Sequence, residues 1–143
     1  MTDFKITDFR NIDDLDVAGK RVLVRADFNV PMKDGVVADA TRIERTAPTI
    51  HDLAARGARV VVISHRGRPQ GKVAGKLSLQ PLAPALAVAL GGRAVTFAAD
   101  CIGPEAEGVV AAMEAGGIVL LENLRFHAGE EENDTDFARE LAA

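Results

Sequence analysis

Residues 59–69 read RVVVISHRGRP, and this stretch indicates the fold class of the 143-residue chain. Arg59 to Ser64 contain an unbroken run of β-branched apolar residues, which is typical of a strand covered on both faces of a sheet. Glycine and proline then interrupt regular structure over residues 65–77. We therefore expect a buried strand over residues 59–64 that ends in a loop.

The same unit of strand, loop and helix recurs on both sides of this stretch. Further strands are predicted over residues 20–26, 94–97 and 118–121, and helices over residues 41–56, 78–90 and about 104–115. Strands separated by helices require parallel pairing and right-handed crossovers. The sequence therefore predicts an α/β fold, a three-layer Rossmann-like parallel sheet with helices on both faces.

Local signals refine the expected boundaries. Thr41 is a candidate N-cap for the first helix, and Pro48 inside it predicts either a kink or a later start. Ser78 is a candidate N-cap for the second helix. The pair Asp34-Gly35 is a turn signal and allows a small hairpin between the first strand and the first helix.

The end of the chain predicts another amphipathic helix from Asp136, capped by Asp134 and Thr135. No glycine, proline or cation follows this helix as a stop signal before Ala143. Either the helix is a terminal element that frays, or the chain is cut from a longer protein in which another strand follows. A truncated or partial chain is the expectation that we carry forward.

Composition favours one domain over residues 1–143, with 48% hydrophobic and 27% charged side chains. The longest apolar run, Leu82 to Leu90, contains Pro84 and is far shorter than the roughly 20 residues that cross a bilayer. The single Cys101 cannot form an internal disulfide, which suits a reducing compartment. No signal peptide is evident, so we expect a cytoplasmic protein without a membrane partner.

Charge is distributed unevenly along a chain whose formal net charge is −4. Residues 42–76 hold eight basic and two acidic side chains, whereas residues 100–143 hold two and eleven. Concentrated positive charge on an acidic chain favours a specific anion site over general nucleic-acid affinity. An RNA-binding module is further disfavoured because Trp and Tyr are absent, which removes the usual stacking platform for bases.

Ligands of parallel α/β sheets collect at the carboxyl ends of the strands. Loops 27–40, 65–77 and 122–132 all follow predicted strands and should share that edge. In the second loop His65, Gly67 and Arg68 lie within one turn, where guanidiniums match the oxygens of phosphate or carboxylate and glycine allows backbone N–H groups to approach an anion. This composition predicts an oxyanion pocket, and a solvated basic loop is the alternative.

Other residues on the same edge could complete the pocket. Asp27 and Asn29 can bind a substrate hydroxyl, although they could also simply cap a turn. Arg42 lies in the first turn of a helix, where a cation is unfavourable, and this suggests an anionic partner. Arg125 leaves the last strand towards the same edge, unless it is a surface arginine beside Glu122.

Several other motifs are weaker. Residues 67–72 and 71–76 lack the spacing and the final Ser or Thr of a Walker A loop, and no G-x-G-x-x-G follows a strand, so no nucleotide cofactor site is predicted in this chain. A metal site is not predicted, because no ligand cluster surrounds His51 or His127 in the sequence. Cys101 is expected to be a small buried residue, and residues 130–132 a solvated loop.

Four blocks together resemble the phosphoglycerate kinase family. They are, in order, RVLVRADFNVP, TRIERTAPTI, VVVISHRGRP and VLLENLRFH, the last followed by GEEEND. They span nearly the whole chain, and the resemblance covers the N-terminal, 3-phosphoglycerate-binding domain only. Arg66 stands where the family usually has an apolar residue, so it either adds charge to the pocket or points to solvent.

The resemblance assigns roles to the candidate residues. Asp27 and Asn29 would hold the glycerate hydroxyl and neighbouring oxygens. Arg42 would lie beside the substrate carboxylate and stabilise the transferring phosphoryl group, as the catalytic residue. The 3-phosphate would be held by His65, Gly67, Arg68 and Arg125.

The resemblance also implies the reaction, a reversible phosphoryl transfer in glycolysis between 1,3-bisphosphoglycerate with ADP and 3-phosphoglycerate with ATP. The Mg-ATP or Mg-ADP cofactor would bind a C-terminal domain beyond Ala143, so this chain alone should be inactive and the complete protein monomeric. A self-contained domain that binds a phosphorylated metabolite without catalysis is the alternative.

Overall fold

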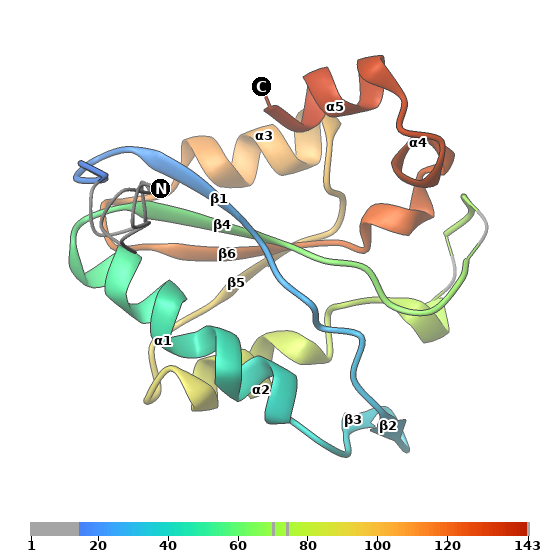
Figure 1. Cartoon of the computed structure of the whole chain (residues 1–143), viewed down its shortest axis with the longest axis horizontal. Helices are drawn as coiled ribbons and strands as arrows, with labels where there is room; N and C mark the ends of the chain where they lie inside the picture. The colour runs from blue at the N-terminus through green and yellow to red at the C-terminus, as the bar shows by residue number, and fades with distance from the viewer. Residues whose placement is uncertain (1–14, 70, 74, 143) are drawn as a thin grey trace, which may run out of the picture.

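A four-stranded parallel sheet forms the centre of the computed structural model, which describes residues 15–69, 71–73 and 75–142 (Figure 1). Each neighbouring pair of strands is parallel, in the order β1-β4-β6-β5. The strands are β1 (Arg21–Arg25), β4 (Arg59–Ile63), β5 (Thr96–Ala98) and β6 (Ile118–Leu121). The predicted α/β class and parallel sheet are therefore confirmed.

Helices cover both faces of this sheet, as the two sides of the ribbon in Figure 1 show. On one face lie α1 (Thr41–Ala55) and α2 (Leu82–Ala89), and on the other lie α3 (Gly103–Ala111) and α5 (Thr135–Ala142). Short helical turns occupy the loops: η3 (Gly75–Leu77), η4 (Leu124–Phe126) and α4 (Ala128–Glu131). Three layers follow from this arrangement, as the sequence predicts.

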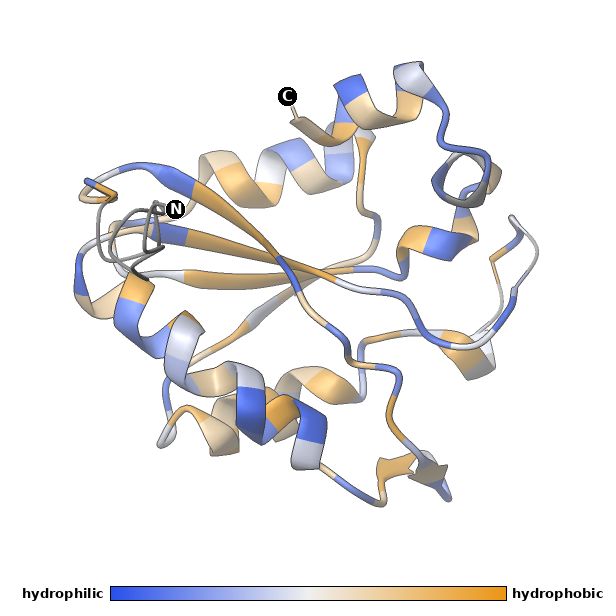
Figure 2. Ribbon diagram, in the orientation of Figure 1, coloured by the Kyte–Doolittle hydropathy of each residue, from blue (hydrophilic) through white to orange (hydrophobic). Residues whose placement is uncertain are grey.

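Two apolar clusters hold the layers together, one on each side of the sheet, and Figure 2 shows the apolar strands between them. Val60 and Val62 of β4 contribute to the cluster under α1 and α2, whereas Val61 and Ile63 contribute to the opposite one. Alternate side chains of a strand point to opposite faces. Each buried side chain of this size contributes about 1.5–3 kcal/mol, so β4 anchors both layers.

Strand β1 lies at the edge of the sheet and is covered less completely than its apolar sequence suggests. Leu23 is 46% exposed, although Val22 and Val24 pack against the cluster under α1 and α2. Among the described residues, the face of β1 towards α1 and α2 is therefore well covered and the opposite face is not.

The first helix begins where predicted, but its cap differs. The N-cap residue is Ala40, which has no capping side chain, while Asp39 Oδ1 accepts hydrogen bonds from the backbone N–H of Thr41 at 2.9 Å and from its hydroxyl at 2.6 Å. The helix runs from Thr41 through Pro48 to Ala55. A start after Pro48 is thereby excluded.

The second helix begins at Leu82 rather than at Ser78, and the reason lies far away in the sequence. The hydroxyl of Ser78 donates to the Glu122 carboxylate at 2.6 Å, and the Leu79 N–H donates to the same carboxylate at 2.8 Å. Glu122 therefore anchors the segment before α2, and a turn over residues 79–81 takes the place of the predicted first helical turn.

The hairpin and the cap of the last helix form as predicted, whereas the third helix is shorter than predicted. Strands β2 (Met32–Lys33) and β3 (Val36–Val37) pair antiparallel around Asp34 and Gly35, which confirms the hairpin. Asp134 accepts from the Phe137 N–H at 3.0 Å, which confirms the cap of α5. The third helix ends at Ala111, earlier than predicted. Among the described residues, no helix combines the length and apolar character needed to span a bilayer.

Candidate anion-binding site

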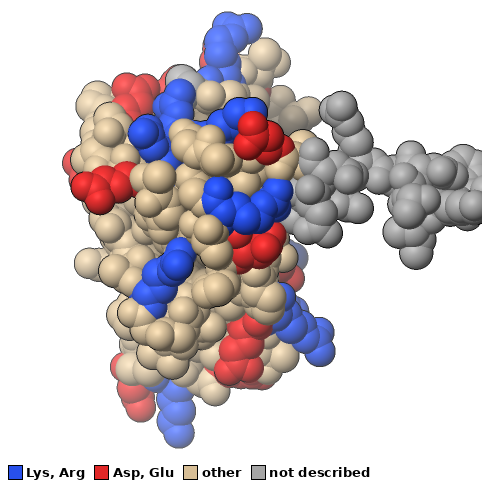
Figure 3. Space-filling model, turned by 90° about the vertical axis from the view of Figure 1, so that its left-hand side faces the viewer, with Lys and Arg blue, Asp and Glu red and all other residues tan. Residues whose placement is uncertain are grey.

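The three loops after β1, β4 and β6 lie at the same end of the sheet, on the right of Figure 1. Figure 3 shows the opposite end, where lysine and arginine side chains alternate with aspartate and glutamate. The predicted convergence of loops 27–40, 65–77 and 122–132 therefore agrees with the strand directions. Each loop contributes charged or polar side chains to this edge.

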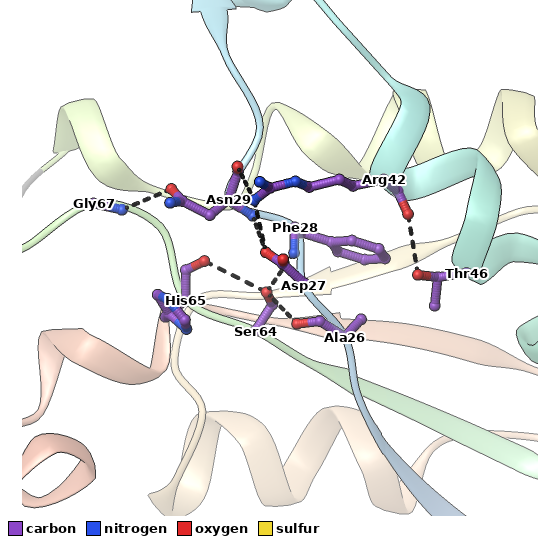
Figure 4. Close-up of polar contacts among 9 residues, drawn as sticks. All are labelled: Ala26, Asp27, Phe28, Asn29, Arg42, Thr46, Ser64, His65 and Gly67. Carbon is purple, nitrogen blue, oxygen red and sulfur yellow. Dashed lines mark hydrogen bonds and ion pairs between the residues drawn. The ribbon is translucent and has the colours of Figure 1, made fainter.

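A buried hydroxyl joins the first two loops. Ser64 is fully buried, and its Oγ donates to the carbonyl oxygen of Ala26 at 2.7 Å while it accepts from the Phe28 N–H at 3.0 Å (Figure 4). Phe28 is itself fully buried in the core. Because Asp27 and Asn29 flank Phe28, this anchor fixes the backbone that carries both polar side chains.

Asp27, Asn29, Arg42 and Gly67 form one hydrogen-bonded group (Figure 4). Arg42 Nη1 donates to Asp27 Oδ1 at 3.1 Å and to the Asn29 carbonyl oxygen at 3.0 Å. Asn29 Oδ1 accepts from the Gly67 N–H at 3.1 Å. The side chains of Arg42 and Asp27 are 53% and 65% exposed, so their ion pair adds about 1 kcal/mol or less to stability and can rearrange around a ligand.

Gly67 makes the turn of the second loop possible. Its φ is +64°, and a Cβ at this position would lie 2.6 Å from Leu77 Cδ2. The positive φ therefore favours glycine, and any larger residue would also have to displace the flexible end of the Leu77 side chain. Its N–H points to Asn29 in this structure and is already used in a hydrogen bond.

The Glu130 carboxylate is the main correction to the sequence analysis. It does not belong to a solvated loop: its side chain is 7% exposed, and it accepts from Arg25 Nη2 at 2.6 Å and from Arg125 Nε at 3.0 Å. Burial opposes ionisation, but the hydrogen bonds and charges of Arg25 and Arg125 outweigh it and hold the pKa of Glu130 below its ordinary value. Two arginines of the edge are thus held by one ionised carboxylate.

Arg25 is a site residue that the sequence analysis missed. It is the last residue of β1, and its side chain meets Glu130, 105 positions later in the chain. The available signal for Arg25 was its place in the sequence: it is a basic residue at the carboxyl end of a strand, two positions before Asp27. The alternative in which Arg125 lies beside Glu122 is not supported, because Glu122 binds Ser78 and Leu79.

His65 follows Ser64 at the end of β4 and is partly buried. Burial lowers its pKa, and the positive charges of Arg125 and Arg25 lower it further, while Glu130 and Asp27 act in the opposite direction. The neutral imidazole is therefore favoured at neutral pH. It can offer one N–H donor to an anion without bringing another full charge.

Arg66 and Arg68 of the second loop differ in their contacts. Arg66 Nη1 donates to the Ser78 carbonyl oxygen at 3.1 Å, so this side chain turns towards the segment before α2. Arg68 is exposed, and no ion pair joins it to another residue in the described part of the chain. Arg68 is therefore available as a guanidinium donor, whereas Arg66 is engaged with the backbone.

The second and third loops also touch. The Gly71 N–H donates to the Arg125 carbonyl oxygen at 3.3 Å, and a Cβ on Gly71 would lie 2.8 Å from Ala128 Cβ. Asn123, which is fully buried, donates from Nδ2 to the carbonyl oxygens of Arg66 at 2.8 Å and of Leu77 at 2.9 Å. Asn123 thus acts as a support that the sequence analysis did not single out.

The comparisons with known proteins agree with this geometry. The family model described as phosphoglycerate kinase matches residues 12–143, almost the whole chain. The chain belongs to the phosphoglycerate kinase family. The family resemblance of the four sequence blocks is thereby confirmed.

Curated phosphoglycerate kinases are similar over most of the chain. One from Rhodospirillum centenum is 57% identical over 135 residues, and one from Granulibacter bethesdensis is also 57% identical. Each match covers 94% of this chain and 34% of the relative. The chain therefore spans about a third of the length of these phosphoglycerate kinases.

Solved structures of phosphoglycerate kinases have the same fold. The crystal structure of the enzyme from Pyrococcus horikoshii OT3 superposes with a TM-score of 0.82 at 30% identity, covering 94% of this chain and 34% of that one. The structure from Coxiella burnetii gives a TM-score of 0.79 at 39% identity, covering 92% and 32%. The sheet and its loop edge thus belong to the phosphoglycerate kinase fold.

Proposed function

We propose that residues 1–143 form the N-terminal substrate-binding domain of a phosphoglycerate kinase, acting on 3-phosphoglycerate and 1,3-bisphosphoglycerate. The observation that carries this proposal is that the loops carrying His65, Arg68 and Arg125 and the first turn of α1, which carries Arg42, meet at one edge of the sheet. A small anion with two charged ends and a hydroxyl matches this set of donors.

One end of the edge suits the 3-phosphate. Arg125 and Arg68 would supply guanidinium donors and His65 an N–H, and the Gly67 N–H would join them if it exchanged its bond with Asn29 for one to a phosphate oxygen. Glu130 neutralises part of the charge of Arg25 and Arg125 and restrains the direction of Arg125. The phosphate would thus meet donors that are already oriented.

The other end of the edge suits the glycerate hydroxyl and carboxylate. Asp27 and Asn29 offer oxygen and amide groups at exposed positions, and Arg42 extends across them from α1. A ligand carboxylate near Arg42 could compete with Asp27 for the guanidinium. Arg42 is the proposed catalytic residue, because a cation there would offset the charge that develops on the transferring phosphoryl group.

The proposed nucleophile needs no general base. The carboxylate of 3-phosphoglycerate is ionised at neutral pH, so the protein has to align it and offset charge rather than remove a proton. The neutral His65 is consistent with this division of work, because it binds rather than abstracts a proton.

The nucleotide is assigned to the part of a complete protein beyond this chain. When bound, Mg-ATP supplies the phosphoryl group that is transferred. The sequence contains neither a Walker A loop nor a G-x-G-x-x-G, so these motifs provide no nucleotide site here. We propose a cytoplasmic, monomeric enzyme in which this chain holds the acid substrate and is inactive by itself.

The test is calorimetric titration of the native-length protein and of the isolated chain with 3-phosphoglycerate. We expect one site in the native-length protein that weakens strongly in Arg125→Ala, together with nucleotide-dependent turnover. Binding without any turnover in the native-length protein would instead support the self-contained binding domain. Equal binding by parent and Arg125→Ala would reject the proposed site.

A further inference from the structure

A second cluster of ligand-type side chains lies where β5 leads into α3. Asp100 and Cys101 occupy this turn, and His127 approaches them from the segment between η4 and α4. One ligand atom from each residue lies within 4.8 Å of the other two. His127 Nε2 is 2.7 Å from Asp100 Oδ1. His127 is thus isolated in the sequence but not in space.

We propose that Asp100, Cys101 and His127 form a binding site for a divalent cation of the Zn²⁺ class. Carboxylate oxygen, thiolate sulfur and imidazole nitrogen are the three ligand types that zinc accepts in proteins, and three protein ligands with a water molecule complete a tetrahedral site. None of the three residues belongs to the proposed phosphoglycerate site, so this inference does not depend on it.

The distances suit such an ion after a small adjustment. With Zn–N and Zn–O bonds of about 2.0 Å, a tetrahedral centre separates the two ligand atoms by about 3.3 Å. The present separation between His127 Nε2 and Asp100 Oδ1 would therefore grow by roughly half an ångström. Because these side chains are 32% and 41% exposed, they have room to make this movement.

Neighbouring groups orient two of the three ligands. The N–H groups of Cys101 and Ile102 donate to Asp100 Oδ1 at 2.7 and 3.5 Å, which orients that carboxylate. The imidazole of His127 packs against the ring of Phe137, with ring centroids 5.6 Å apart. Restrained ligands of this kind lose little freedom when a metal binds, and such neighbours contribute measurably to metal affinity.

The position of the thiol places the ion at the boundary between the core and water. Cys101 is 2% exposed and packs in the apolar cluster under α3 and α5, whereas Asp100 and His127 reach solvent. On binding, the thiol would release its proton to water and form the S–Zn bond. The hydrogen bond between His127 Nε2 and Asp100 Oδ1 would break, and the imidazole would bind the ion through Nε2 with its proton on Nδ1. The charge of the ion would reverse the local preference for a neutral thiol.

A cation here would connect two segments that are distant in the sequence. It would hold the turn before α3 to His127, which lies two positions after Arg125. Binding to the folded state alone raises stability, so the site would act as a structural clip beside the loop that carries Arg125.

The experiment titrates the native-length protein with Zn²⁺ by calorimetry and with Co²⁺ by absorption spectroscopy. Co²⁺ coordinated by a thiolate gives a ligand-to-metal charge-transfer band, so the loss of this band in Cys101→Ser reports on Cys101 itself. We expect one site, with affinity reduced about tenfold or more in His127→Gln and in Asp100→Asn. His51→Gln, at an exposed histidine of α1, is the matched control and should bind as the parent does.

Zn²⁺ should also raise the Tm of the parent and of His51→Gln but not that of His127→Gln. Circular dichroism checks that each variant folds. If Cys101→Ser does not fold, His127→Gln and Asp100→Asn, at partly exposed positions, provide the test. The proposal is overturned if the band persists in Cys101→Ser or never forms. Unchanged zinc affinity in both His127→Gln and Asp100→Asn would overturn it as well.

Discussion

The two ends of the sheet use arginine in different ways. At the amino ends, Arg56 pairs with Asp52 one helical turn away and donates to the Leu15 carbonyl oxygen, and Arg93 donates to the Gly116 carbonyl oxygen. These contacts hold neighbouring segments of backbone together. The mixed charges in Figure 3 agree with a surface that serves the fold.

At the carboxyl ends, arginines outnumber the carboxylates that bind them. Arg25 and Arg125 share Glu130, Arg42 pairs with the exposed Asp27, and Arg68 has no ion pair with another described residue. This difference in contacts supports the proposal that the carboxyl end binds an anion, whereas Arg56 and Arg93 at the amino end hold backbone carbonyl groups.

Arg42→Ala should produce the largest effect, tested in the native-length protein. We expect the turnover number to fall by about 10³-fold or more, because a cation beside the transferring phosphoryl group is lost. The Michaelis constant for 3-phosphoglycerate should change much less. Steady-state kinetics measure both.

The matched control for Arg42 is Arg56→Ala, which removes an arginine from the opposite end of the sheet. Its turnover number should stay close to that of the parent. If both variants lose turnover equally, the contrast between the two ends is wrong.

Arg68→Ala and Arg125→Ala should mainly raise the Michaelis constant for 3-phosphoglycerate. A charge-assisted hydrogen bond contributes about 1.5–3 kcal/mol, so each substitution should raise this constant by roughly 10- to 150-fold. Arg93→Ala at the amino end serves as the control in the same assay. An unchanged constant in both loop variants would remove these residues from the phosphate site.

Glu130→Gln should reduce stability by about 1–3 kcal/mol at neutral pH, because a buried carboxylate that binds two arginines loses its charge. Its pKa is lower in the folded state than in the unfolded one, so its contribution is present above the ordinary glutamate pKa and is lost as pH falls through the lower folded value. Urea denaturation across this pH range should show that the free energy of unfolding falls more steeply for the parent than for Glu130→Gln. If the free energies of unfolding of the two proteins fall in parallel with pH, the role of Glu130 is contradicted. Glu132→Gln, at an exposed position, is the control.

His65 should show the smallest effect, a change in its pKa that NMR titration of the ring protons can follow. Burial and the charge of Arg125 lower this pKa, so Arg125→Ala should raise it, and so should saturating inorganic phosphate. If neither change moves the His65 titration, the imidazole does not face the proposed phosphate position.

Patterns within one segment predict much of the fold. The apolar runs of β4 and β6 and the turn signal at Asp34-Gly35 give the sheet class and the hairpin, because each depends on neighbouring residues alone. The start of α2 is predicted wrongly, because Ser78 binds Glu122, which lies 44 positions later in the chain. No local pattern contains that contact.

The candidate site likewise has features that the sequence predicts and contacts that it does not. Parallel topology suffices to predict that the loops carrying Asp27, His65 and Arg125 share one edge. It does not predict that Glu130 folds back between Arg25 and Arg125, because that contact needs the end of β1 and the start of α4 to meet in space. Acidic runs are usually solvated, and here the tertiary structure overrides that tendency.

The buried hydroxyl of Ser64 separates the scaffold of the site from its chemistry. Ser64 and Phe28 set the path of the first loop from inside the core, while Asp27 and Asn29 project from that path at exposed positions. Side chains on the rim can therefore be exchanged without a new backbone conformation. An edge built in this way is adaptable, since the recognition of a different anion requires new rim residues and not a new fold.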